Sequence, residues 1–430
     1  MNIIHINSSD ISGGAARAAY RIHKSLLENK KKYNIESIMR VMKKDSDDFT
    51  VVGRPPLNKS KFFIRSLPYL AKISRFGFST ENPILHSTAP FRSGLCQELK
   101  KRFKKNRNEI VHLHWLGDNT LSIEEIGEIP QRVVWTLHDF WPFCGAEHYL
   151  HYDLKNMILR DERYKNGYTK NNKSHFDKGR DINKKTWLRK KRHWKKKIDI
   201  VCPSKWMYES AKQSVLMKDW DINIIPHPID LNKWSPVEKK IARKILNLKA
   251  NKVYILFNAF GVISDPRKGI NLLFKAILHL HSLIKSPYLN KIEILIFGQS
   301  SPKNIPRLGF PTKYFGRLND EISLRLLYSA ADLMVVPSIQ EAFGLTASES
   351  QACGTPVVAF RNSGLIDVID HEVTGYLANP FDYLSLAQSI KWVLDNSSEF
   401  KLGINARKRA ESLWDSKIIA KQYYDLYSSK

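Results

Sequence analysis

The chain has 430 residues, and its 69 Lys and Arg outnumber its 42 Asp and Glu to give a formal net charge of +27. Hydrophobic residues make up 43%, and with 20 Gly and 19 Pro the composition excludes collagen-like and low-complexity proteins. The length favours two or three domains. No apolar run approaches the roughly 18 residues that cross a bilayer. Four scattered Cys without a C-x2-C pair predict free thiols in a reducing compartment, so we expect a cytoplasmic protein.

The positive charge is concentrated in the first half of the chain. Residues 151–200 alone contain 17 basic against 6 acidic residues, in stretches such as KKTWLRKKRHWKKK. Such a patch attracts polyanions, whether nucleic acid, acidic lipid or a phosphorylated substrate. The alternative is a solvated, partly disordered loop.

The first half alternates short apolar runs with helical patterns. It opens with a strand over residues 2–6, a Ser/Asp/Gly turn and an alanine-rich helix. Such alternation is typical of parallel strands in an α/β layer. Residues 42–100 have no clear period and are expected to form helices and loops at one edge. Further strands are expected within 36–41, 110–116, 132–140, 198–204 and 222–228.

A second α/β pattern begins after the prolines of PHPIDLNKWSP, which place a domain boundary near residue 236. We therefore expect two facing, doubly wound Rossmann-like domains, 1–235 and 236–412, with a ligand cleft between them. A final amphipathic helix within 413–430 is expected to pack back on the first domain. The second domain is expected to contain strands within 252–260, 291–298, 312–318, 331–338, 355–360 and 375–378, and helices over 269–284, 320–330, 345–353 and 383–396.

Two carboxylates recur in one loop and helix of the second domain. Glu341 and Glu349 are separated by seven residues in VPSIQEAFGLTASESQACGTPVVAF. Eight helical residues span about 12 Å, which is too far for a glycosidase acid and nucleophile at about 5–9.5 Å. A loop beside a helix start does suit a phosphorylated or hydroxylated ligand, because free N–H groups and the positive end of the helix dipole point at it.

This arrangement resembles the family 4 retaining glycosyltransferases, which have the two-domain GT-B fold. Four other stretches agree with that family in their order and spacing: SDPRKG, FGRL, PHPID and the C-terminal LWDSKIIAKQYYDLY. NSSDISGGAARAAYRIH and TLHDFWPFCGAEHY are similar to the branch that contains colanic-acid and other bacterial surface-polysaccharide glycosyltransferases. Many members of that branch carry a Cys-rich stretch where this chain has a Lys-rich one. The basic insertion of about 150–197 therefore departs from the pattern.

The resemblance implies roles in binding a nucleotide-sugar donor. Arg267 and Lys268 would hold the diphosphate, one through bidentate hydrogen bonds and the other as a point charge. Glu341 would contact hydroxyls of the donor sugar and Glu349 those of the ribose, since a carboxylate accepts such hydrogen bonds well. Without the resemblance, Arg267 and Lys268 are interpreted as solvated side chains at the start of a helix. Glu349 is then interpreted as a side chain that caps its helix or faces solvent. The backbone contacts implied are Arg317 and Leu318 for the base, and Phe343, Gly344 and Leu345 for the phosphates.

The first domain contributes three candidates. Gly13 and Gly14 precede a helix and allow backbone N–H groups to approach an anion; by the resemblance they close on the donor phosphate. His138 matches the family's His near the donor sugar, the alternative being a structural His at a strand end. His112 and His114 alternate with apolar residues and are interpreted as structural or supporting. No cluster of His, Cys and carboxylates has metal-ligand spacing, so no metal site is expected.

The chemistry implied is transfer of a hexosyl group with retention, from a nucleoside diphosphate sugar to a saccharide or polyprenyl-diphosphate-linked saccharide in bacterial surface-polysaccharide biosynthesis. Cations and helix N-termini would stabilise the leaving diphosphate without a metal or other cofactor. One alternative is a nucleotide-sugar epimerase of the same architecture, against which the E-x7-E loop argues. The other is a basic nucleic-acid-binding protein, but no RNP-like or other recognised module appears, and we expect no nucleic-acid partner.

The basic insertion suggests a peripheral position on the inner face of the membrane. Each Lys or Arg close to an anionic surface contributes about 1 kcal/mol. If the stretch is helical, Trp187 and Trp194 are nearly two turns apart and would add interfacial anchoring. The alternative is that the segment packs on the first domain with its tryptophans buried.

Overall fold

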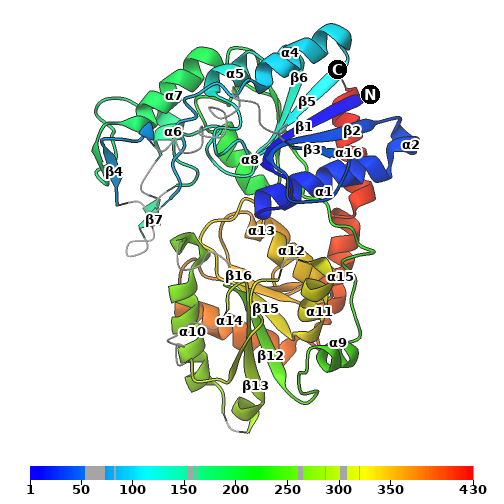
Figure 1. The fold of residues 1–430 in the computed structure, drawn as a ribbon. Helices are drawn as coiled ribbons and strands as arrows, with labels where there is room; N and C mark the ends of the chain where they lie inside the picture. The colour runs from blue at the N-terminus through cyan, green and yellow to red at the C-terminus, as the bar shows by residue number, and fades with distance from the viewer. Residues whose placement is uncertain are drawn as a thin grey trace. The chain divides into compact units, whose positions relative to one another are not determined.

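The computed structural model describes residues 1–53, 73–81, 84–150, 152–153, 158–159, 162–259, 265–285, 287–300, 308–318 and 320–429. The chain forms two compact units, Met1–Pro228 with Ile419–Lys430, and Ile229–Ile418. Each contains a parallel sheet with helices packed against it (Figure 1). The division follows Pro228, a few residues before the position that the prolines indicated. Among the described residues, none of the helices combines the length and the apolar character needed to cross a membrane.

The sheet of the first unit has the strand order β11-β10-β6-β5-β1-β2-β3, and its neighbouring strands pair in parallel. It continues in both directions from β1, as expected of a doubly wound sheet. Its strands are β1 (Asn2–Ser9), β2 (Glu36–Lys43), β3 (Val51–Val52), β5 (Glu109–Leu113), β6 (Arg132–Thr136), β10 (Asp199–Cys202) and β11 (Ile222–Ile224). The helices of this unit are α1 (Gly14–Glu28), α2 (Lys30–Tyr33), α4 (Leu95–Lys105), α5 (Ile123–Gly127), α6 (Arg163–Asn166), α7 (Ile182–His193) and α8 (Lys205–Lys212).

One face of this sheet is covered by α1 and by the C-terminal helix α16 (Ser416–Ser428). Ile22 and Leu26 of α1 share a buried cluster with Tyr423 and Tyr427 of α16. The Arg132 side chain donates to the last carbonyl groups of α16, at 2.6 and 2.7 Å. The final helix thus contributes directly to the core of the first unit.

The segment 42–100 contains more strand than its sequence indicated. Its described part includes the edge strand β3 and the short β4 (Phe78–Thr80), which pairs antiparallel with β9 (Asp177–Gly179). A second antiparallel pair joins β7 (Tyr152–Asp153) to β8 (Ile158–Leu159). Residues 54–72 lie outside the described part of the chain.

The basic insertion is folded against the first unit. Helix α7 packs on α5, and Trp187 and Trp194 are 4% and 6% exposed. Arg189 forms an ion pair with Glu124 at 2.7 Å. Placing the two tryptophans in a membrane interface was therefore wrong: their rings fill the space between α7 and the rest of the unit. Residues 151, 154–157, 160 and 161 of the insertion lie outside the described ranges.

Lys190 of α7 is completely buried. Its ammonium donates hydrogen bonds to the carbonyl oxygens of Trp141, Cys144 and Gly145 and lies 4.0 Å from the centre of the Trp141 ring. Burial lowers the pKa of Lys190 to about 7, and the three carbonyl acceptors and the aromatic face stabilise the protonated form. Lys190 cannot touch a lipid surface; it fixes the loop that follows β6.

The sheet of the second unit has the order β14-β13-β12-β15-β16-β17 and is also parallel. Helices α10 and α14 pack together, α14 against β15, β16 and β17, whereas α12 packs against β15 and β16 with α11 and α15 beside it. The strands are β12 (Val253–Asn258), β13 (Ile292–Phe297), β14 (Thr312–Tyr314), β15 (Leu333–Val336), β16 (Val357–Phe360) and β17 (Gly375–Ala378). The helices are α9 (Lys239–Ile245), η2 (Pro266–Lys268), α10 (Ile270–Leu283), η3 (Tyr288–Lys291), α11 (Glu321–Ala330), α12 (Leu345–Ala352), α13 (Leu365–Val368), α14 (Tyr383–Asn396) and α15 (Leu402–Leu413).

Candidate functional site

A small pocket lies at the carboxyl ends of the two central strands of the second unit. Strands β13 and β14 follow β12 in the chain and lie on one side of it in the sheet, whereas β15 lies on its other side. The pocket is therefore at the switch point of a doubly wound sheet, where ligands of such folds bind. It is lined by Asn258, Lys268, Met334, Val335, Val336, Pro337, Ser338, Glu341 and Thr346.

Lys268 and Glu341 meet in this pocket. The Lys268 ammonium donates to Oε1 of Glu341 at 2.6 Å, and the same oxygen accepts a hydrogen bond from the Ser338 hydroxyl at 2.9 Å. Burial alone would raise the pKa of Glu341, but the charge and hydrogen bond of Lys268 outweigh it and hold the pKa below its ordinary value. The pocket thus presents an ionised carboxylate beside an ammonium, and both side chains retain some exposure.

Backbone geometry brings Lys268 to this position. Gly269 follows η2 with φ +66°, and a Cβ there would lie 1.9 Å from the carbonyl oxygen of Pro337. Only glycine permits this approach. The Ile339 N–H donates to the Arg267 carbonyl at 2.6 Å and ties the turn to the loop after β15.

Arg267 lies next to Lys268 but does not line the pocket. Its guanidinium donates to both carboxylate oxygens of Asp265, at 3.0 and 2.6 Å. Asp265 also accepts the backbone N–H of Arg267 and caps η2. Arg267 would have to share or exchange this partner to bind a diphosphate, so its role stays a prediction. Ser264, the first residue of the SDPRKG motif, lies outside the described residues.

Glu349 occupies a different environment from Glu341. It is 3% exposed within α12, and its Oε2 accepts a hydrogen bond from the Tyr328 hydroxyl at 3.1 Å. The interpretation of Glu349 as a solvent-facing side chain is therefore wrong. A ribose contact through Glu349 is not tested and stays a prediction.

The loop between the two glutamates presents backbone rather than side chains. Phe343 is buried with its ring edge-on to Trp414 at 5.9 Å. Gly344 has φ +109° and caps α12, whose first residue is Leu345. Arg317 is exposed and Leu318 packs against the core beyond β14. These placements are compatible with backbone contacts to a ligand and do not test them.

In the first unit, Gly13 and Gly14 lie at the exposed start of α1. Gly13 has φ +96°, and a Cβ at either glycine would meet no described residue within 4 Å beyond its neighbours in the chain. Helix α1 is 15 residues long, and its N-terminus has no side-chain cap among the described residues. Its first N–H groups are thus available to an anion.

His138 follows β6 and is 7% exposed. Its ring stacks on His227 at 5.1 Å, and its Nε2 lies 3.2 Å from Nδ1 of His114. Burial lowers the pKa of His138 to about 4, although the charge of Asp139 opposes this. His138 is therefore a neutral imidazole at neutral pH.

The neighbouring Asp139 holds a second histidine. Its Oδ2 accepts hydrogen bonds from His148 Nδ1 at 2.6 Å and Trp115 Nε1 at 2.7 Å. His148 Nε2 in turn meets the Ser87 hydroxyl at 2.8 Å. Burial would raise the pKa of Asp139, but the interactions with His148 lower it below its ordinary value. Together with the Lys190 contacts, this network fixes the loop that carries His138.

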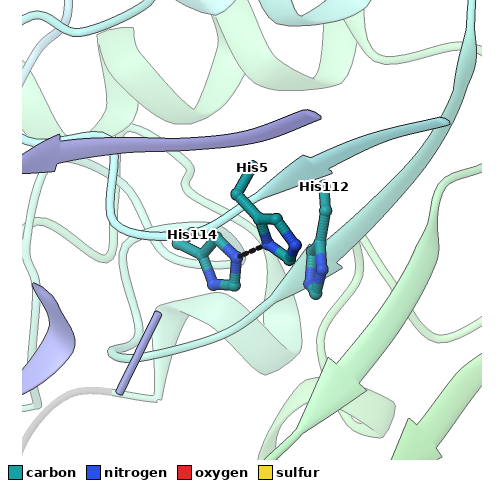
Figure 2. Close-up of side chains that lie close together, drawn as sticks. All are labelled: His5, His112 and His114. Carbon is teal, nitrogen blue, oxygen red and sulfur yellow. Dashed lines mark hydrogen bonds between the residues drawn. The ribbon is translucent and has the colours of Figure 1, made fainter. Parts of the chain in front are cut away.

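Three further imidazoles, those of His5, His112 and His114, lie close to one another, as Figure 2 shows. His5 of β1 is directly paired with His112 of β5, and His114 follows β5. Ligand nitrogens of the three lie within 4.8 Å of one another, which is a donor set that suits a transition metal. However, His5 Nδ1 and His114 Nε2 bond each other at 2.9 Å, and His112 bonds the hydroxyls of Thr136 and Tyr427. A metal would have to displace these bonds.

The sequence reasoning missed this cluster. It grouped His112 with His114 but did not connect them to His5, which lies more than a hundred residues away. The alternation His112-x-His114 was the available signal for this cluster. Residues at the end of β5 lie beside the neighbouring strand β1, which carries His5.

Comparison with known proteins bears on the second unit most directly. Residues 238–409 match the family model described as "Glycosyl transferases group 1". A D-inositol 3-phosphate glycosyltransferase of Geodermatophilus obscurus is 33% identical over 199 residues, which cover 44% of this chain and 43% of the relative. The chain therefore aligns with less than half the length of that relative.

Solved structures match the whole chain at lower identity. Sucrose-phosphate synthase from Thermosynechococcus elongatus has a TM-score of 0.65 and 21% identity, with 100% of this chain and 98% of that chain covered. Anabaena HepE in complex with UDP and glucose has a TM-score of 0.62 and 16% identity, with full coverage of both chains. The chain thus has the GT-B fold of two Rossmann-like domains, and its residues 238–409 are similar to the group 1 glycosyltransferases.

Proposed function

We propose that this protein is a retaining glycosyltransferase that moves a hexosyl group from a nucleoside diphosphate sugar to an acceptor hydroxyl. The observation that carries the proposal is the Lys268–Glu341 pair in the pocket at the switch point of the second unit, inside the residues that match the family. An ammonium suits a diphosphate and an ionised carboxylate suits sugar hydroxyls. One pocket therefore offers partners for both ends of a sugar–phosphate bond.

The chemistry follows from where charge develops. As the bond between the anomeric carbon and the phosphate oxygen breaks, negative charge accumulates on the diphosphate. Lys268, with Arg267 beside it, and the N-terminus of α12 would stabilise that charge in the transition state. The acceptor oxygen forms the new bond on the same face, and its proton passes to the leaving diphosphate, as the family resemblance implies. Cations of the chain take the place of a divalent metal in this proposal.

Two acceptors are candidates. The motif resemblance favours a saccharide or a polyprenyl-diphosphate-linked saccharide of bacterial surface-polysaccharide biosynthesis. The curated relatives are instead named for D-inositol 3-phosphate, and a phosphorylated polyol would also be attracted by the basic first unit. A peripheral position at an anionic membrane belongs to the first candidate only, because a lipid-linked acceptor is presented there.

A ligand panel tests the proposal. Thermal unfolding is followed with nucleoside diphosphates, nucleoside diphosphate sugars and free nucleosides, since a ligand at 100 times its Kd adds about 2.7 kcal/mol of stability. We expect stabilisation by one nucleoside diphosphate and its sugar, which Lys268→Met reduces. Lys291→Met, at an exposed lysine of the same unit, is the matched control. If no nucleoside diphosphate or its sugar stabilises the protein, the proposal is wrong.

The two acceptors are then separated by transfer assays. Labelled donor is supplied with a polyprenyl-diphosphate saccharide, a free saccharide or D-inositol 3-phosphate. Formation of a glycosylated product, with the anomeric configuration read by NMR, distinguishes a retaining transferase from an epimerase, which would alter the donor without any acceptor.

A further inference from the structure

Three imidazoles form an unbroken hydrogen-bonded series in the first unit. His5 Nδ1 meets His114 Nε2 at 2.9 Å, and His114 Nδ1 meets His138 Nε2 at 3.2 Å. His5 and His114 are 0% and 2% exposed, and Figure 2 shows the first of the two bonds, between neighbouring strand segments. Burial lowers the pKa of each ring, so all three are neutral at neutral pH.

A neutral imidazole donates with one nitrogen and accepts with the other. The central His114 is bonded at both nitrogens, so its two bonds must run in the same direction along the series. Only two arrangements satisfy this condition: every ring carries its proton on Nδ1, or every ring carries it on Nε2. The tautomer of His138 is thereby coupled to that of His5.

The buried end of the series decides between the two arrangements. His5 Nε2 is fully buried and has no hydrogen-bond partner among the described residues. If it carried the proton, an N–H donor would be buried without an acceptor, a situation that is rarer in proteins than an unsatisfied acceptor. Protons on Nδ1 leave only a bare lone pair at His5. The same arrangement leaves an N–H at the less deeply buried end, on Nδ1 of His138, which is 7% exposed.

We propose that His5 and His114 are positioning residues that lock His138 in the Nδ1–H tautomer, so that His138 acts toward substrate only as a hydrogen-bond donor to an oxygen. The identity of that oxygen rests on the proposed function, whereas the tautomer itself is independent of it. No nitrogen of His138 is then left to take a proton: Nε2 is occupied by His114 and Nδ1 is already protonated.

Nitrogen NMR of protein labelled at histidine tests the proposal without substrate. The His138 ring is assigned by its loss in His138→Gln. We expect a pyrrole-like Nδ1 and a pyridine-like Nε2 at pH 7.5. The opposite pattern, or a mixture of tautomers in the wild-type protein, would overturn the proposal, and this reading does not require any variant other than the assignment variant to fold.

Variants then test the coupling. In His114→Phe the series is broken, and we expect His138 to populate both tautomers and kcat to fall about tenfold, which corresponds to one lost hydrogen bond of roughly 1 kcal/mol or slightly more. His112→Gln is the matched control, because His112 lies in the same cluster but bonds Thr136 and Tyr427 instead. An unchanged His138 tautomer in His114→Phe, or an equal change in both variants, contradicts the coupling. A locked Nδ1–H tautomer in a protein that binds no nucleotide sugar would leave the series intact and refute only the proposed function.

Discussion

The Lys268 ammonium and the Glu341 carboxylate form an ion pair of 2.6 Å between segments 73 positions apart in sequence. A ligand that enters this pocket meets both charges together. The pair keeps each group from being buried alone, and it couples the protonation of Glu341 to the presence of Lys268.

Replacing Lys268 with Met should slow transfer by about ten- to a hundredfold, because a charge-assisted contact contributes about 1.5–3 kcal/mol. Burial would then raise the pKa of Glu341 against the weaker opposition of Arg267 and the Ser338 hydroxyl, so the acidic limb of the pH–rate profile should move to higher pH. Lys268→Arg should retain the acidic limb. Turnover of the three proteins between pH 4.5 and 8 tests both the slower transfer and the shifted acidic limb. Wild-type rates in Lys268→Met would exclude Lys268 from the site.

Glu341 and Glu349 should affect different parts of one ligand. Glu341→Ala should abolish transfer while the nucleoside diphosphate still binds. Glu349→Ala should weaken the binding of the nucleoside diphosphate itself. The reason is their placement: one lies in the pocket, and the other lies inside α12 against Tyr328. Calorimetry with nucleoside diphosphate and with whole donor is the measurement. Tyr328→Phe controls for loss of the buried hydrogen bond, and equal losses for both ligands in both glutamate variants would contradict this division.

Lys190→Met should destabilise the protein by about 3 kcal/mol, since it removes the hydrogen bonds that three buried carbonyl groups accept from Lys190. Lys185→Met removes an exposed lysine from the same helix and should change the free energy of unfolding by less than about 0.5 kcal/mol. Urea unfolding of both variants is the measurement. Similar stability of the two would show that the buried ammonium is dispensable.

Stability should fall as the pH drops from about 6.5 toward 4. Burial lowers the pKa of His23, His86 and His138 to about 4, so the unfolded chain takes up protons first. In this pH window, each such histidine lowers the free energy of unfolding by up to about 1.4 kcal/mol per pH unit. Ion-paired carboxylates lose their contribution at lower pH: hydrogen bonds from Arg92 and Lys100 hold the pKa of Glu128 at about 2. An unfolding free energy that is constant between pH 7 and 5 would contradict the histidine contribution.

Any attraction of the basic insertion to anionic vesicles should depend on its exposed cations and not on its tryptophans. Replacing Lys191, Arg192, Lys195 and Lys197 with Gln should abolish sedimentation with anionic vesicles at low salt, and high salt should do the same to the wild-type protein. Neutral vesicles are the control. Binding that survives these four substitutions would place the membrane contact elsewhere.

The parallel strands and most helices of the second unit were predictable, because buried strands of a doubly wound sheet are short continuous apolar runs. The helix expected over 383–396 is present as Tyr383–Asn396. The packing of helix α7 on the first unit was anticipated only as an alternative to a membrane contact, since cations dominate its sequence. Its buried face depends on Trp187 and Lys190, and a lysine enclosed by carbonyl groups looks the same in sequence as a lysine in water.

The candidate site was predictable only in part. The motif around Gly269 placed Lys268 in a functional turn, but the sequence did not reveal that Arg267 is held by Asp265 or that Glu349 is buried against Tyr328. These contacts depend on the packing of segments distant in sequence. The meeting of His5 with His114 likewise depends on strand order, which local patterns do not determine.

The second unit is one continuous segment, whereas the first unit takes its last helical residues from the far end of the chain. During synthesis on the ribosome, the first unit therefore remains without Tyr423 and Tyr427 until residues 229–418 have emerged. At about 5–20 residues per second, that interval lasts on the order of 10 to 40 s. Over this time the apolar face that α16 covers, together with His112, is open to water and to chaperones, and the second unit can fold before the first is complete.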